Sequence, residues 1–237
     1  MYSESADLYD LIYASQGKDY SAEARKIHDL AQLYQKSTGN SLLDVACGTG
    51  MHAAHLRPYY DVRGIDQDQK MLEMARNNHP GILFEAGDMR NFNFEAKFDV
   101  ITCLFSSIGY MLTLDDLQKA AANMSEHLKP GGVLFVEPWF EPGSWKGGSI
   151  HTISVDQPDL KIVRMNASGQ NGKISFFTYH YLVGTSKGVR YFTEHHELAL
   201  FSREEYTSAF ENAGLKVIFD EQGLYGRGLY IGIRSMS

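Results

Sequence analysis

Short apolar runs alternate with segments of helical spacing between residues 41 and 137. These runs are continuous, whereas a strand with one solvated face would alternate apolar and polar residues. Strands that alternate with helices form right-handed crossovers in a parallel sheet. We therefore predict an α/β fold with a doubly wound sheet covered on both faces. The predicted strands are 41–46, 61–65, 82–84, 99–104 and 133–137, and the predicted helices are 51–56, 67–78 and 114–128.

The pattern changes after Pro138. The segments 161–166, 173–182 and 188–200 alternate apolar and polar residues and are separated by glycine-containing turns, which predicts antiparallel hairpins. We therefore expect an antiparallel β insertion over 139–200, after the fifth strand.

Both ends of the chain also carry local signals. Residues 1–18 form a tyrosine-rich arm, and 19–36 have the spacing of an amphipathic helix. Ser202 and Glu205 form a capping box for a last helix, and 215–220 and 228–233 are predicted strands. We expect a single domain, 1–237, with the arm and first helix at 1–40.

Composition excludes several classes of protein. The 22 Lys and Arg residues are outnumbered by 29 Asp and Glu residues, and the net charge of −7 argues against a nucleic-acid partner. The two cysteines, Cys47 and Cys103, lie in apolar stretches, so we expect buried packing residues and a reducing cytoplasm. We find no basic leader and no run of about 20 apolar residues, and therefore expect no membrane association.

The strongest local motif is a predicted strand that runs into a glycine-rich turn at 42–50. Gly48 and Gly50 let the backbone turn tightly and approach a ligand. Asp66 ends the second strand, where a carboxylate accepts hydrogen bonds from ribose hydroxyls. Asp88, in a Gly-Asp-Met triplet after the third strand, is placed to accept from an adenine amino group. The glycines alone do not separate NAD from other adenosine cofactors.

This ordered set, with the Pro-Gly-Gly turn at 130–132, resembles the class I S-adenosylmethionine-dependent methyltransferases. The resemblance implies a Rossmann-like methyltransferase sheet and S-adenosylmethionine as cofactor. NAD would also require a hydride acceptor and a catalytic His or a Tyr-x-x-x-Lys pair, which we do not find. Ala46 stands where the family often has glycine. The implied cofactor-binding residues are Tyr9, Asp44, Ala46, Gly48, Gly50, Asp66, Gly87, Asp88, Met89 and Leu104.

Other chemistries fit less well. His195 and His196 are adjacent, so on a strand they point to opposite faces and cannot chelate one metal together. We find no His-Glu-x-x-His or Cys-x-x-Cys motif and expect no metal site. The charged run 194–197 is predicted to be a solvated strand face.

Further stretches are similar to the dTDP-3-amino-sugar N,N-dimethyltransferases that finish deoxysugars of macrolide antibiotics. This resemblance implies a dTDP-amino-deoxysugar as acceptor. Another small-molecule acceptor, or a cofactor-binding protein without turnover, remains an alternative, and the sequence does not distinguish a 3-amino from a 4-amino sugar or one methylation from two. The matching stretches are 8–11, 17–20, 44–50, 87–90, 105–110, 136–139, 187–190, 213–215 and 226–229.

The resemblance also suggests residues for the acceptor side, to which the insertion is expected to contribute. Tyr110, after the fourth strand, is the candidate catalytic residue, and we expect it to position the amine, because tyrosine is a weak general base at neutral pH. The alternatives are a general base and an aromatic ring packed over the cofactor. Arg164 and Arg227 are candidates for the diphosphate, with surface ion pairs as the alternative. The remaining substrate candidates are Tyr2, Tyr20 and Trp139. A homodimer is a further expectation.

Overall fold

The computed structural model describes residues 4–236, which form two sheets. The larger has seven strands in the order β10-β11-β5-β4-β1-β2-β3. The strands β3, β2, β1, β4 and β5 are parallel, and β11 runs antiparallel to both β5 and β10. Their bounds are β1 Ser41–Val45, β2 Asp61–Asp66, β3 Leu83–Ala86, β4 Phe98–Cys103, β5 Leu128–Val136, β10 Leu215–Asp220 and β11 Leu229–Arg234.

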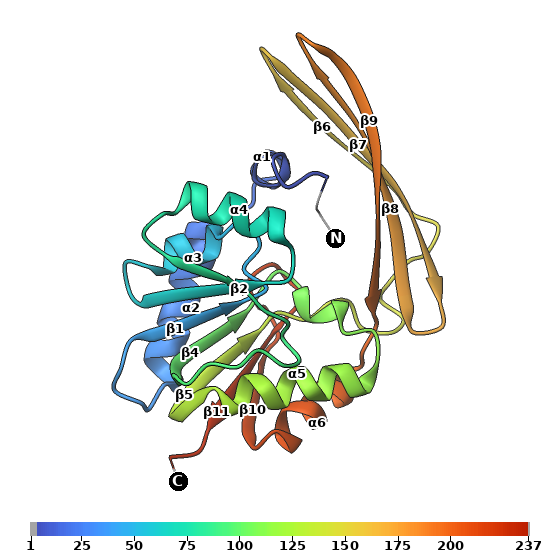
Figure 1. The fold of residues 1–237 in the computed structure, drawn as a ribbon. Coiled ribbons are helices and arrows are strands. Elements are labelled where there is room, and N and C mark those ends of the chain that lie inside the picture. Colours follow the sequence, from blue (N-terminus) through green and yellow to red (C-terminus); the bar gives the residue numbers. More distant parts are fainter. Residues whose placement is uncertain (1–3, 237) are drawn as a thin grey trace.

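Helices cover both faces of this sheet, as the continuously apolar strands predict (Figure 1). One face packs against α2, α3 and α4, and the other against α5 and α6. Fully buried strand residues such as Leu42 and Leu43 supply opposite faces of the core. The helices are α2 Tyr20–Tyr34, α3 Met51–Leu56, α4 Gln69–Asn78, α5 Leu114–Glu126 and α6 Arg203–Asn212.

The predicted doubly wound sheet is confirmed, and most boundaries shift by only one or two residues. The Pro-Gly-Gly turn is the exception, because residues 128–132 lie within β5 and the pairing with β4 shifts register there. The predicted capping box of α6 is present, with Ser202 and Glu205 each bonded to the other's backbone N–H. Cys47 and Cys103 are free and buried, as expected. No helix among residues 4–236 is long and apolar enough to cross a membrane.

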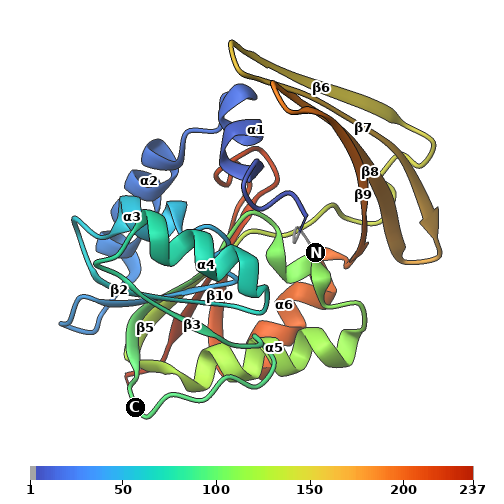
Figure 2. The ribbon, with the colours of Figure 1, turned by 45° about the horizontal axis from the view of Figure 1, so that its top comes forward.

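The insertion forms a second, four-stranded antiparallel sheet in the order β6-β7-β8-β9 (Figures 1 and 2). Its first strand, β6, was not predicted, because only Val155 of its eight residues is buried. The short helix α1 (Tyr9–Ser15) was also not predicted; it packs through Leu8 and Ile12 against this sheet. The strands are β6 Ile150–Gln157, β7 Leu160–Asn171, β8 Ile174–Thr185 and β9 Gly188–Ala199.

Candidate active site

The turn after β1 is built from left-handed backbone conformations. Ala46, Gly48 and Gly50 have φ of 57°, 55° and 81°. A Cβ on Gly50 would lie 2.7 Å from the Phe84 ring, so this glycine is required for packing and α3 begins directly after it. A Cβ on Gly48 would meet nothing within 4 Å, because that residue faces an open cleft. Ala46 has a left-handed backbone, which glycine adopts without a steric cost and which residues with a Cβ adopt rarely; this accounts for the frequent glycine of the resembling family at this position.

Asp66, at the end of β2, holds this turn in place. One carboxylate oxygen accepts the Gly48 N–H at 2.8 Å, and the other accepts the Asp68 N–H at 2.8 Å. Burial raises the pKa of this carboxyl group. Each carboxylate oxygen has a second lone pair, so Asp66 retains acceptor capacity toward the cleft that it lines.

A cleft of about 260 Å³ follows the ends of β1, β2 and β3, and we call it the cofactor cleft. Six of the predicted cofactor-binding residues line it: Tyr9, Ala46, Gly48, Asp66, Gly87 and Met89. Among the described residues, Asp88 and Gly50 are not part of its lining. The carboxylate of Asp88 is bound instead by Arg90, at 2.5 Å, and Arg90 itself lines the cleft.

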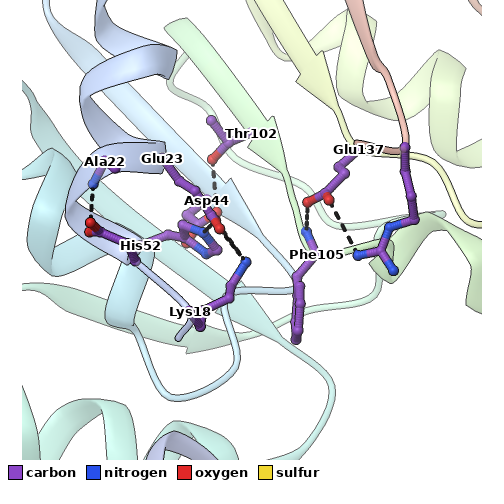
Figure 3. Close-up of polar contacts among 10 residues, drawn as sticks. Lys18, Ala22, Glu23, Asp44, His52, Thr102, Phe105 and Glu137 are labelled. Carbon is purple, nitrogen blue, oxygen red and sulfur yellow. Dashed lines mark hydrogen bonds and ion pairs between the residues drawn. The ribbon is translucent and has the colours of Figure 1, made fainter. Parts of the chain in front are cut away.

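A small cavity of about 40 Å³ adjoins the cofactor cleft at Gly48, and its lining includes Asp44, Leu104, Tyr20 and His52. Asp44 Oδ1 accepts a hydrogen bond from Thr102 Oγ1 at 2.8 Å (Figure 3). Among the described residues, neither Asp44 Oδ2 nor the Tyr20 hydroxyl has a hydrogen-bond partner, although both atoms are buried. Burial raises the pKa of Asp44 to about 6. Buried polar atoms need partners, so this cavity suits a small cationic group.

Tyr20 therefore lies beside the turn after β1 and not where the sequence placed it, with the substrate candidates. Its ring stands edge-on to His52, with 4.9 Å between centroids. Behind it, Glu23 accepts from His52 at 2.7 Å and pairs with Lys18 at 2.7 Å (Figure 3). Lys18, which sequence reasoning missed, lies 4.0 Å from the centre of the Phe105 ring.

A second and larger cleft, of about 550 Å³, lies between the two sheets, and we call it the inter-sheet cleft. It shares Tyr9, Ser107 and Tyr110 with the cofactor cleft, so the two clefts meet at these side chains. Tyr110 ends the short 3-10 helix η1 (Ser107–Tyr110) that follows β4. The other predicted residues in its lining are Trp139, Arg164 and Arg227, and Lys18 joins them. Tyr2 lies outside the described residues.

The two arginines of this cleft are held differently. Arg164, on β7, is 5% exposed and lies over the ring of Tyr179 at 4.2 Å; no carboxylate pairs with it within residues 4–236. It is therefore buried, and the alternative of a surface ion pair is wrong. Arg227 pairs with Glu137 at 3.3 Å, and Glu137 has no exposed side-chain surface.

Glu137 connects Arg227 to an unusual turn. Its other carboxylate oxygen accepts the Phe105 N–H at 2.7 Å (Figure 3). Phe105 and Ser106 both have left-handed backbones, with φ of 53° and 61°, which side chains rarely adopt. Ser106 Oγ donates to Pro138 O at 2.6 Å. Contacts from the end of β5 thus hold the strained turn that presents Tyr110, and such strain is typical of functional sites.

The charged run 194–197 is only half solvated, which corrects the sequence prediction. Glu194 is buried and accepts hydrogen bonds from the N–H and Oγ of Ser5 at 3.1 and 2.7 Å. His196 is 1% exposed, and its Nδ1 lies 2.8 Å from the Tyr110 hydroxyl. The alternation of a strand buries these two side chains and exposes His195 and Glu197. That alternation was the available signal for His196.

The residues present fit S-adenosylmethionine. The unpartnered oxygen of Asp44 and the Tyr20 hydroxyl suit its ammonium group, and Asp66 suits its ribose hydroxyls. The strand order, the glycine turn and these acidic groups define a class I S-adenosylmethionine-dependent methyltransferase.

Comparisons with known proteins support the assignment to the methyltransferases. A family model described as a methyltransferase domain matches residues 42–132. The chain is 40% identical to dTDP-3-amino-3,4,6-trideoxy-alpha-D-glucopyranose N,N-dimethyltransferase of Streptomyces venezuelae, over 97% of this chain and 98% of that protein. It is 39% identical to dTDP-4-amino-2,3,4,6-tetradeoxy-D-glucose N,N-dimethyltransferase of Saccharopolyspora spinosa, over 98% and 93%.

Solved structures give the same result. The crystal structure of Streptomyces venezuelae DesVI superimposes with a TM-score of 0.92 at 40% identity, covering 97% of this chain and 98% of that one. S-adenosylmethionine-bound CalS10, an amino pentose methyltransferase of Micromonospora echinaspora, gives 0.87 at 35% identity, covering 96% and 97%. The chain belongs to the family of the dTDP-amino-sugar N,N-dimethyltransferases, and S-adenosylmethionine is its cofactor.

Proposed function

We propose that this enzyme transfers methyl groups from S-adenosylmethionine to the amino group of a dTDP-amino-deoxysugar, twice in succession. The observation that carries the proposal is the junction of the two clefts at Tyr9, Ser107 and Tyr110. A donor in one cleft and an acceptor in the other would meet there. The substrates in the names of the relatives, which cover nearly the whole chain, support the choice of acceptor.

The cofactor supplies an electrophilic methyl group on a positive sulfur. In this proposal Asp44 and Tyr20 hold its ammonium end and Asp66 its ribose, with Gly87 and Met89 beside the adenine. The amine nitrogen must be neutral to form the new bond to carbon, and its surplus proton leaves to water. The main contribution of the chain is orientation, because holding two reactants in line removes much of the entropic barrier. Tyr9 and Tyr110 close the junction against water.

The inter-sheet cleft offers groups for a nucleotide diphosphate. Three cationic side chains line this cleft: Lys18, Arg164 and Arg227. One guanidinium group can bind two phosphate oxygens through two parallel hydrogen bonds. Trp139, Trp145 and Phe177 give it an aromatic wall, with ring centroids 5.4 to 6.2 Å apart. We propose that the nucleotide lies against these groups, so that residues 139–200 complete the acceptor site of a single domain.

Three expectations accompany this proposal. The acidic balance argues against a nucleic-acid partner, and the enzyme is proposed to work in the cytoplasm as a homodimer. Light scattering on a gel-filtration column measures the homodimer directly.

Mass spectrometry tests the reaction. Purified protein and S-adenosylmethionine are incubated with a dTDP-3-amino-dideoxyhexose, with its 4-amino isomer, and with thymidine diphosphate alone. The two relatives act on different positions at nearly equal identity, so the pair of isomers also assigns the position. We expect an added mass of one and then two methyl groups on one isomer. Cofactor binding without methylation of either sugar would contradict the proposal.

A further inference from the structure

One hydrogen bond joins the two sheets at the junction of the clefts. Tyr110 belongs to η1, which follows the carboxyl end of β4 in the seven-stranded sheet, and His196 belongs to β9 of the second sheet. The Tyr110 hydroxyl lies 2.8 Å from Nδ1 of His196. Tyr110 lines both clefts, so its hydroxyl lies where donor and acceptor are proposed to meet.

The imidazole ring of His196 is held among aromatic side chains. Phe177 stacks on it, with 5.3 Å between centroids and 23° between planes, and Tyr179 stands edge-on at 5.3 Å. Burial lowers the pKa of His196 to about 3, so the ring is neutral at neutral pH. A neutral imidazole has one nitrogen that accepts and one that donates a hydrogen bond.

We propose that His196 is a positioning residue for methyl transfer. Its Nδ1 accepts a hydrogen bond from the Tyr110 hydroxyl and so fixes the direction of that hydroxyl. The inference rests on the proposed function. With its proton committed to His196, the Tyr110 oxygen can act only as an acceptor toward the substrate amine. An amine that donates an N–H to this oxygen keeps its lone pair free and turned away from Tyr110. A hydroxyl free to rotate would also donate to that lone pair and hold the amine in an unreactive state.

The arrangement has a second consequence for the acceptor side. Tyrosine is a weak base at neutral pH, so we expect the Tyr110 hydroxyl to orient the amine and not to deprotonate it. To orient the amine, the hydroxyl must itself be held in one direction. The strained turn at Phe105 and Ser106 fixes the backbone that leads to Tyr110, and His196 fixes the far end of the side chain. The insertion thereby contributes to the reaction itself as well as to the wall of the cleft.

Four single variants test this role. His196→Leu removes the acceptor, and we expect kcat for the amino sugar to fall about five- to tenfold, the equivalent of one hydrogen bond. His196→Asn places an amide oxygen near the position of Nδ1 and should recover most of kcat, whereas His196→Gln reaches toward Nε2 and should not. The matched control is His195→Leu, on the opposite face of the same strand, where the side chain is 52% exposed and bonded to Thr178; kcat should be unchanged. KM for S-adenosylmethionine should stay the same in all four.

A double variant shows whether His196 acts through Tyr110. In a Tyr110→Phe background, His196→Leu should cause no further loss of kcat, because the hydroxyl that it orients is already gone. Additive losses, or a His196→Leu enzyme with wild-type kcat, would overturn the inference while leaving the proposed function in place. If His196→Leu does not fold, the contrast between Asn and Gln at the same position decides. Absence of methylation by the wild-type protein would overturn the proposed function and this inference together.

Discussion

The two clefts that meet at Tyr110 are built in different ways. The cofactor cleft is assembled largely from consecutive strand ends between residues 46 and 90, and its central groups are backbone turns held by one carboxylate, Asp66. The inter-sheet cleft draws its groups from α1, η1, all four strands of the insertion and the segment at 225–227. The first is fixed by the topology of one sheet, whereas the second exists only where two sheets and the N-terminal helix come together.

The charges of the two clefts differ as well. The cofactor side concentrates carboxylates whose pKa values are raised by burial, at Asp44 and Asp66. The inter-sheet side concentrates cations, and it stabilises them with aromatic faces as well as carboxylates, as Arg164 over Tyr179 shows. The difference suits a cationic donor on one side and an anionic nucleotide on the other. It also predicts that substitutions on each side affect mainly one ligand.

The largest expected effect is on the cofactor side. Asp66→Ala removes the acceptor of the Gly48 and Asp68 N–H groups and of the ribose hydroxyls. We expect Kd for S-adenosylmethionine to rise about 100-fold, because hydrogen bonds to a charged group are worth about 1.5–3 kcal/mol each. Isothermal titration calorimetry measures it, with Asp61→Ala, at the exposed start of the same strand, as the control. Unchanged cofactor affinity in Asp66→Ala would contradict the assignment of the first cleft to the cofactor.

The next effect belongs to the inter-sheet side. Arg227→Ala should raise KM for the nucleotide sugar by at least about tenfold through loss of charge-assisted hydrogen bonds to phosphate. Kd for S-adenosylmethionine should change less than about twofold, because distant sites act independently. Arg227→Lys keeps a charge beside buried Glu137 and should lie between wild type and Arg227→Ala. Arg203→Ala, an exposed ion pair on α6, is the control. Equal losses for both ligands would mean that Arg227 is misplaced here.

Cofactor affinity should also depend on pH through Asp44. Its pKa is raised to about 6, so the carboxylate is ionised above pH 7 and protonated as the pH falls through 6. Only the ionised form attracts the ammonium group, and affinity should drop about tenfold between pH 7 and pH 5. Measuring Kd for S-adenosylmethionine across this pH range in the wild type and in Asp44→Asn shows whether Asp44 causes the drop. A pH dependence of the same size in Asp44→Asn would show that another group is responsible.

The smallest effect should spare both clefts. Ser202→Ala removes the N-cap of α6, which packs on the sheet face opposite α2 to α4. We expect the free energy of unfolding to fall by about 1 kcal/mol in urea titrations. Kd for the cofactor and kcat should keep their wild-type values. A loss of activity would show that the acceptor side extends further than its lining residues.

The same contrast explains what the sequence could predict. The turns at Gly48, Asp66 and Gly87 lie in contiguous motifs, and a parallel sheet brings the carboxyl ends of its strands together without further information. Other contacts near these turns could not be predicted from the sequence. Arg90 binds the carboxylate of Asp88, and Tyr20 lies beside Asp44. Both contacts depend on how the loops and α2 pack.

The inter-sheet cleft was predictable only in part. Resemblance pointed to Arg164, Arg227 and Trp139, but the residues that hold them come from distant positions. Glu137 is paired 90 positions away with Arg227, and Tyr110 lies 86 positions from His196. Strand alternation in 194–197 would have buried Glu194 and His196, yet their charge favoured a solvated interpretation. Long-range pairing of this kind leaves no local pattern.

A crystal structure of the enzyme with S-adenosylhomocysteine and its dTDP-amino sugar tests the central claim most directly. The account predicts the nucleotide between the two sheets, with its diphosphate on Arg164 or Arg227 and the sugar amine within hydrogen-bond distance of the Tyr110 hydroxyl. A nucleotide bound outside the inter-sheet cleft, or an amine remote from Tyr110, would contradict it.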